Sequence, residues 1–141
     1  MAEVGVYERV AAEIQLVRLR FPAVRHGDKY DWILVPEYPL PQGRFTMVNT
    51  NLLFRLPPGY PSTGPDDFFV EGGLRLVGGT SPPGFNQGSQ SSSGPAPIPG
   101  NWGWFSWHPV SWRPTANIRD GDNLLTFLRG VNQCLRGVER T

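Results

Sequence analysis

The sequence is poor in the residues and charges on which several common classes of function depend. Its 141 residues include one cysteine and two histidines, which excludes an internal disulfide, a thiolate metal cluster and a histidine zinc site. Thirteen basic and twelve acidic residues give a net charge of +1, so no summed field attracts nucleic acid or a membrane surface. We therefore expect no metal, no cofactor and no polyanionic partner.

Long apolar runs are absent as well. No uninterrupted run reaches the roughly 18 residues that a membrane-spanning helix requires, and the acidic start at Glu3 is unlike a signal peptide. These absences favour a cytoplasmic protein. What the chain has in quantity is glycine and proline, 17 and 15 residues, which predict long connections between short elements.

A chain of this length fits one domain with one hydrophobic core. We assign residues 1–141 to a single domain. Residues 79–101 are its most polar part, with glycine, serine, proline, glutamine and asparagine and almost no large apolar side chains. Such a composition cannot offset its own ordering entropy by burial. It predicts a flexible surface loop, inserted between two halves that are both needed for the core.

Two segments have the three- and four-residue apolar spacing of an amphipathic helix. The first predicts a helix over residues 4–20, stopped by Pro22, with Glu13 among its polar positions. The second predicts a closing helix that is capped by Asp120 or Asp122. The apolar positions are Tyr7, Val10, Ile14, Val17 and Phe21 in the first helix, and Leu124, Leu128, Val131, Leu135 and Val138 in the second.

Short runs of strand-forming residues lie between the two helices. In the longest run, Leu52, Phe54 and Leu56 share one face, while Leu53 and Arg55 point to the other. Prolines end such runs, because proline has no N–H to donate to a sheet. The predicted strands are Tyr30–Val35, ended by Pro36; Phe45–Val48 and Thr50–Leu56, or one long strand broken at Asn49; and Asp67–Val70.

Four motifs follow one another along the chain. They are VPEYPLP at residues 35–41, LLFRLPPGYP at 52–61, a serine-x-histidine element at 106–108 and WRP at 112–114. This ordered set resembles the ubiquitin-conjugating fold over most of the chain, from about Val4 to Val138. It is most similar to a bacterial branch of that superfamily, prokaryotic family E.

The resemblance implies an α+β fold, in which an antiparallel sheet is combined with an N-terminal and a C-terminal helix. It implies three partners: a ubiquitin-like protein, a ThiF-like adenylating activating enzyme, and a JAB-type or related peptidase. The implied activity is that of an acyltransferase, which accepts the C-terminus of the modifier and passes it to an amine. The alternative is a non-catalytic relative that binds the modifier or the activating enzyme.

Two departures from typical conjugating enzymes concern the nucleophile. Those enzymes place a His-Pro-Asn triplet before a catalytic cysteine, and its asparagine supports the oxyanion. Here His108-Pro109-Val110 lacks the asparagine and follows the expected position of the nucleophile. The single cysteine, Cys134, lies on the closing helix beyond the WRP motif, so we interpret it as a small hydrophobic residue.

Ser106 and His108 are therefore the candidate catalytic residues. They flank Trp107, so in an extended segment both side chains point to the same side. A serine hydroxyl needs an adjacent base to act as a nucleophile, and histidine is the usual one. We expect Ser106 to accept the modifier as an oxyester while His108 takes the proton. Asn101 is a candidate oxyanion donor, and Trp107 and Trp112 are candidate supports.

Plainer readings exist for the same residues. Ser106 and His108 also fit a loop in which the hydroxyl satisfies a backbone group and the imidazole caps the turn. The tryptophans of residues 102–112 form a platform for sugars or proline-rich peptides if they are exposed, and part of the core if they are buried. Their exposure distinguishes these two readings.

Overall fold

The structure is a computed structural model that describes residues 2–137. Over this range the chain forms two helices and eight strands. In chain order these are α1 (Ala2–Arg20), β1 (Arg25–His26), β2 (Trp32–Pro39), β3 (Asn49–Arg55), β4 (Phe68–Glu71), β5 (Phe85–Gln87), β6 (Gln90–Ser91), β7 (Gly94–Pro95), β8 (Trp102–Phe105) and α2 (Leu124–Leu135).

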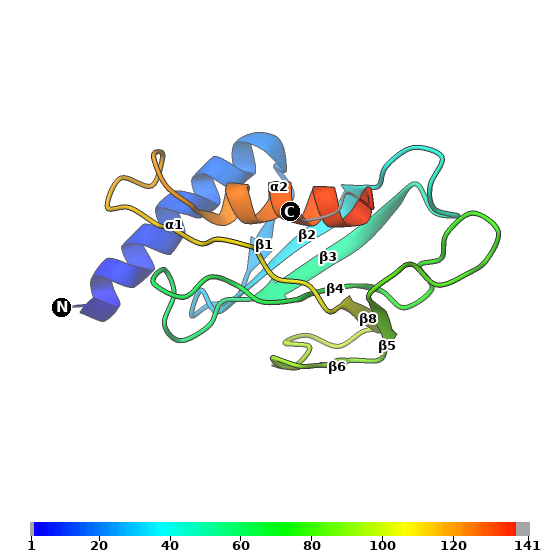
Figure 1. Ribbon diagram of the computed structural model, residues 1–141. Coiled ribbons are helices and arrows are strands. Elements are labelled where there is room, and N and C mark those ends of the chain that lie inside the picture. The colour runs from blue at the N-terminus through cyan, green and yellow to red at the C-terminus, as the bar shows by residue number, and fades with distance from the viewer. Residues whose placement is uncertain (1, 138–141) are drawn as a thin grey trace.

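Six of these strands form one antiparallel sheet in the order β1-β2-β3-β4-β8-β5, and β6 and β7 form a separate hairpin. Figure 1 shows α1 and α2 on the same face of this sheet, while β6 lies on the opposite face. The predicted α+β fold, with an antiparallel sheet and helices at the two ends of the chain, is confirmed.

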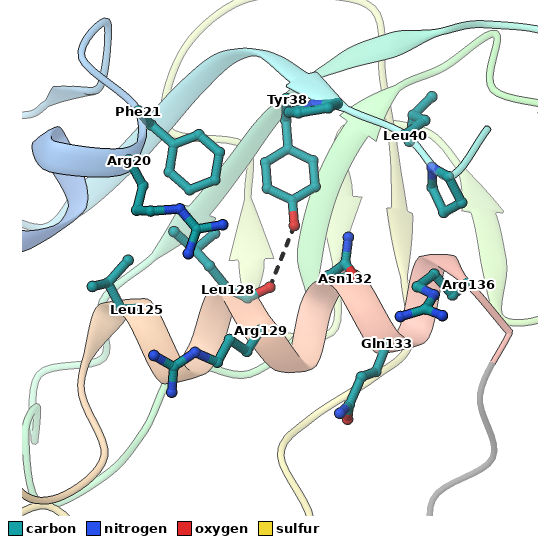
Figure 2. A pocket seen from close by; sticks show the side chains of 12 residues that line it. Arg20, Phe21, Tyr38, Leu40, Leu125, Leu128, Arg129, Asn132, Gln133 and Arg136 are labelled. Atoms are coloured by element: carbon teal, nitrogen blue, oxygen red, sulfur yellow. Dashed lines mark hydrogen bonds between the residues drawn. The ribbon is translucent and has the colours of Figure 1, made fainter.

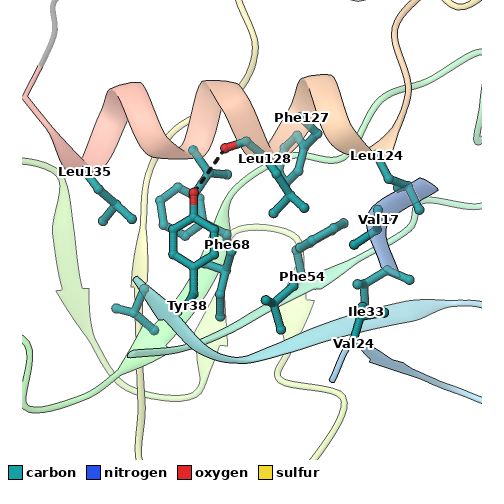
Figure 3. Close-up of a cluster of buried hydrophobic side chains, with 14 of the residues drawn as sticks. Val17, Val24, Ile33, Tyr38, Phe54, Phe68, Leu124, Phe127, Leu128 and Leu135 are labelled. Atoms are coloured by element: carbon teal, nitrogen blue, oxygen red, sulfur yellow. Dashed lines mark hydrogen bonds between the residues drawn. The ribbon is translucent and has the colours of Figure 1, made fainter. Parts of the chain in front are cut away.

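The main core lies between the sheet and the two helices. Four of the predicted apolar positions of α2, namely Leu124, Leu128, Val131 and Leu135, are buried there, and Val138 lies outside the described residues. Figure 3 shows this stripe facing the sheet. The rings of Phe54 and Phe127, whose centroids are 4.7 Å apart, join the two layers.

The two faces of β3 separate two clusters. Leu52 and Phe54 belong to the main core under the helices, whereas Leu53 belongs to a smaller cluster on the opposite face. The alternation predicted for this strand is therefore confirmed. Trp102 of β8 joins Leu53 in the smaller cluster, and half-buried Ile98 packs against it. Residues near the β6–β7 hairpin thus cover the face of the sheet that the helices leave open.

The predicted strand boundaries are partly wrong. β2 continues through Pro36 to Pro39, because a bulge between Val35 and Tyr38 takes the proline out of the regular ladder. β3 includes Asn49, so the chain has no break there. Phe45–Val48 is not a strand: Phe45 is buried and forms only an isolated bridge to Leu76.

Residues 79–101 contain regular structure that their composition does not predict. β5 pairs with β8 at the edge of the main sheet, with Phe85 opposite Phe105. Backbone pairing of this kind requires no large side chains, which is why a polar composition did not reveal it. The flexibility of this segment stays a prediction.

The first residue before α2 also differs from the prediction. The cap is Asn123, whose side chain accepts a hydrogen bond from the backbone of Thr126 at 3.0 Å, and the Thr126 hydroxyl accepts one from the backbone of Asn123 at 2.9 Å. The predicted cap Asp122 instead accepts a hydrogen bond from the backbone N–H of Arg113 at 2.6 Å. The reciprocal hydrogen bonds between Asn123 and Thr126 form a capping box, which fixes where the helix begins.

Glu13 is buried, although the spacing placed it on the polar side of α1. Its carboxylate accepts hydrogen bonds from the hydroxyl of Tyr60, from the backbone N–H of Leu124 at 2.7 Å and from Nε of Arg9 at 2.7 Å. Burial is tolerated because the charge is paired and its oxygens are satisfied. This group of residues, Arg9, Glu13, Tyr60 and Leu124, is called the Glu13 cluster below, and it joins α1, the turn after β3 and the first residue of α2.

Candidate functional site

The segment that follows β8, residues 106–108, is held from both sides by backbone hydrogen bonds. The backbone N–H of Ser106 donates to the carbonyl of Gly84 at 2.9 Å, and the backbone N–H of Asp67 donates to the carbonyl of Trp107 at 2.7 Å. Within it, Ser106 and His108 are exposed while Trp107 between them is buried. This alternation places Ser106 and His108 on the same, solvent-facing side.

Trp107 anchors this Ser106 segment, as we name residues 106–108, to the core. Its ring centroid lies 5.9 Å from that of Phe68 and 5.6 Å from that of Phe127. Gly130 on α2 makes room for the indole, because a Cβ atom at this position would lie 2.6 Å from the indole Cη2. The exposed residues on either side are therefore attached to a fixed base.

An open pocket of about 520 Å³ adjoins the Ser106 segment. Ser106 and Trp107 line one side of it, and Cys134 and Gly137 line the side formed by the end of α2. Pockets of a few hundred Å³ hold small ligands or short chain ends. Cys134, which is far from Ser106 in the sequence, thus shares its pocket, and it is half-buried against the main core.

Asp66 is a polar neighbour of His108 that the sequence reasoning missed. Its Oδ1 lies 3.9 Å from Nδ1 of the imidazole, and both side chains are exposed. If the antiparallel register of β4 and β8, with Phe68 opposite Phe105, is continued by two residues, Asp66 falls opposite Trp107, the residue next to His108. A carboxylate at this place can orient the imidazole.

Asp67, the next residue, has a different role. It is buried and accepts hydrogen bonds from the Ser92 hydroxyl at 3.0 Å, the Ser93 hydroxyl at 2.8 Å and the Ser93 backbone at 3.2 Å. Burial raises the pKa of Asp67, and the hydrogen bonds from the serines oppose that rise in part. These bonds attach the β6–β7 hairpin to the start of β4, beside the Ser106 segment.

Asn101 is not brought close to Ser106. It precedes β8 whereas Ser106 follows it, so the extended strand separates the two residues by roughly 17 Å. Its side chain lies instead against Gly72, where an added Cβ atom would be 2.8 Å from the Asn101 Oδ1. Asn101 therefore supports the far end of the strand.

Trp112 supports the turn after β3. Its indole Nε1 donates to the carbonyl of Pro61 at 2.7 Å, and its ring centroid lies 6.1 Å from that of Tyr60. All five tryptophans of the chain are buried or half-buried, so they form no exposed row of rings. This exposure supports the reading in which they build the core and its margins.

Within the described residues, no three histidine, cysteine, aspartate or glutamate side chains are grouped so that they could bind a metal ion. Neither helix of that range is long and apolar enough to cross a membrane.

A family model described as "Prokaryotic E2 family E" matches residues 14–137, a range that contains the whole sheet, the Ser106 segment and α2. No curated protein and no solved structure gives a significant match.

Proposed function

Because this chain belongs to the prokaryotic E2 family E, we propose that it carries a ubiquitin-like modifier as an oxyester on Ser106. The family is E2-like, so a conjugating-enzyme-like role in general follows from membership, as does contact with a modifier and its activating enzyme. The identity of the nucleophile is our proposal. The observation that supports it is an exposed serine on an anchored segment, beside a pocket and on the same side as a histidine.

The chemistry assigns one task to each group. The Ser106 Oγ attacks the activated carbonyl carbon of the modifier C-terminus, the new C–O bond forms, and the bond to the leaving group of the activating enzyme breaks. His108 accepts the hydroxyl proton, and Asp66, 3.9 Å from its Nδ1, stabilises the imidazolium that results. An acceptor amine then attacks the ester carbonyl, and the serine oxygen leaves with a proton returned by His108.

An oxyester releases less free energy on aminolysis than a thioester does, so positioning must supply more of the acceleration. The Ser106 segment suits that requirement. Gly84 and Asp67 form hydrogen bonds with its backbone, and the side chain of its central residue, Trp107, is buried. The pocket next to Ser106 is the place where the last residues of the modifier would lie.

The test uses the protein with its activating enzyme, ATP and the modifier. We expect an adduct that hydroxylamine cleaves, that reducing agents leave intact, and that Ser106→Ala abolishes. Ser111→Ala is the matched control, because Ser111 is an exposed serine five residues along the same stretch. An adduct that survives in Ser106→Ala, or none in the wild type, would refute the assignment.

A second candidate function is a scaffold that binds the modifier or the activating enzyme without a covalent step. The observation in its favour is the position of Asn101 at the opposite end of β8, which leaves the site without an asparagine oxyanion donor. Calorimetry that detects saturable binding of the modifier, with no adduct under activating conditions, would favour this scaffold over the carrier.

The setting of the reaction is proposed on the same basis. We place the protein in the cytoplasm, with a ThiF-like activating enzyme upstream of it and a JAB-type or related peptidase acting on the modifier. Co-purification of the tagged protein with an adenylating enzyme from the source cells tests this setting, and its failure leaves the Ser106 assay unaffected.

A further inference from the structure

A second pocket, of about 430 Å³, lies on the other side of α2 from the β8 end of the sheet. It is formed where the end of α1, the end of β2 and the outer face of α2 meet, as Figure 2 shows. Ser106 and Cys134 do not line it. What this pocket binds is therefore a separate question from the identity of the acyl acceptor.

The pocket carries a local excess of positive charge. Arg20, Arg129 and Arg136 line it together with the amides Asn132 and Gln133, and no carboxylate is among the lining residues. Figure 2 shows Arg20 beside Phe21, and Arg129 and Arg136 at different turns of α2. None of these arginines forms an ion pair within the described residues. Because the whole chain has a net charge of only +1, three guanidinium groups lining one pocket are a concentrated feature.

The floor of the same pocket is apolar. Phe21 and Tyr38 stack with ring centroids 5.5 Å apart, and Leu128 is buried next to them. The Tyr38 hydroxyl donates to the carbonyl of Leu128 at 3.4 Å, so it is already used within the protein. The floor thus offers a site for a non-polar side chain, and the rim offers donors for anions.

The geometry favours carboxylates spread along a chain over a compact phosphate. Phosphate sites use backbone N–H groups at helix N-termini or glycine-rich turns. No helix N-terminus lines this pocket, because α1 meets it at its last residue, Arg20, and α2 from Leu125 to its end before Arg136. Arg129 and Arg136 are seven residues apart on α2, which places their Cα atoms roughly 10 Å apart along the helix axis. Carboxylates three residues apart in a polyproline II segment are separated by roughly 9 Å.

We propose that this pocket binds an acidic peptide segment of a partner protein. One non-polar side chain of the segment enters the floor formed by Phe21, Tyr38 and Leu128. Acidic side chains about one polyproline II turn apart pair with Arg129 and Arg136, and Arg20 closes the other side of the opening. The arginine side chain suits this task because its planar guanidinium accepts a carboxylate in two parallel hydrogen bonds.

The probe is a fluorescein-labelled peptide with the sequence Pro-Glu-Pro-Leu-Glu-Pro, and binding is measured by fluorescence anisotropy at low salt. We expect saturable binding that weakens about tenfold in the double variant Arg129→Glu, Arg136→Glu and weakens as salt is added. Arg119→Glu is the control, since Arg119 is exposed and outside the pocket. Circular dichroism verifies that each variant is folded.

Four outcomes would overturn the proposal. The first is an absence of saturable binding by the wild type, and the second is equal binding by the double variant. The third is equal binding of a peptide in which both glutamates are replaced by glutamine. That result would show that only the apolar floor of the pocket contributes to binding. Displacement of the bound peptide by AMP or ATP at low concentration would identify a phosphate site instead. Because none of these measurements involves Ser106, their results are independent of the carrier assay.

Discussion

The Glu13 cluster and the Ser106 segment place polar side chains in opposite settings. In the Glu13 cluster, a buried carboxylate is satisfied by three donors: Arg9, one turn earlier on α1, and Tyr60 and Leu124 from distant parts of the chain. In the Ser106 segment, the backbone is held on both sides while the side chains of Ser106 and His108 are exposed. The comparison teaches that polar side chains in the first region join parts of the fold, whereas in the second they are exposed at the surface.

The largest expected effect is on stability, at Glu13. Glu13→Ala leaves the Tyr60 hydroxyl and the Leu124 N–H buried without an acceptor, and it leaves Arg9 without its ion-pair partner. We expect the free energy of unfolding to fall by about 3–5 kcal/mol, measured by urea denaturation. Glu8→Ala, an exposed glutamate on the same helix, is the control. Equal losses in both variants would show that the cluster contributes nothing specific.

A smaller effect is expected at the cap of α2, next to the Glu13 cluster. Asn123→Ala removes the acceptor of the Thr126 N–H and half of the capping box. The free energy of unfolding should fall by about 1 kcal/mol. Asp120→Ala and Asp122→Ala separate the observed cap from the predicted ones. If Asp120→Ala costs as much as Asn123→Ala, then the capping assignment is wrong.

Asp67 sharpens the comparison because it is a buried carboxylate next to the exposed site. Its raised pKa means that the folded protein binds this proton more tightly than the unfolded chain does. Its contribution to stability is therefore largest at acidic pH and is lost as the pH rises through the raised pKa. As the pH rises above the ordinary aspartate pKa, we expect the free energy of unfolding to decline less for Asp67→Asn than for the wild type. A steeper decline in the variant would contradict this sign.

The smallest effect on stability is expected in the Ser106 segment itself. Ser106→Ala and His108→Gln remove exposed side chains, so each should change the free energy of unfolding by less than about 0.5 kcal/mol. His108→Gln should nevertheless slow adduct formation by about 10²-fold or more, because it removes the base. The rate of adduct formation is measured in single-turnover experiments. A large loss of stability in either variant would show that these side chains contribute to the stability of the folded protein.

Local patterns in the sequence predicted much of the fold. The apolar spacing of α2 and the alternation of β3 were sufficient to identify the buried faces, since each depends on neighbours a few residues away. Glu13 could not be predicted in the same way, because its partners Tyr60 and Leu124 are brought to it only by the folded chain. The strand pairing of Phe85 with Phe105 depends on backbone groups that composition does not describe.

The candidate site shows the same division. Ser106 and His108 were predicted from a motif three residues long, and their exposure on one side agrees with the extended geometry that the motif implied. Asp66 and Cys134 were missed as neighbours of this segment, because one approaches through strand register and the other through the packing of α2. Asn101 was a candidate for the missing asparagine, and the intact strand β8 separates it from Ser106.

The central claim is that a serine hydroxyl, held on a rigid segment and exposed, takes the place of a cysteine thiol as the acyl carrier. Its most direct test is tandem mass spectrometry of the adduct formed with the activating enzyme, ATP and the modifier. We predict the C-terminal remnant of the modifier in ester linkage to Ser106, and none on Cys134. A remnant on Cys134, or on a residue outside the Ser106 segment, would contradict the account.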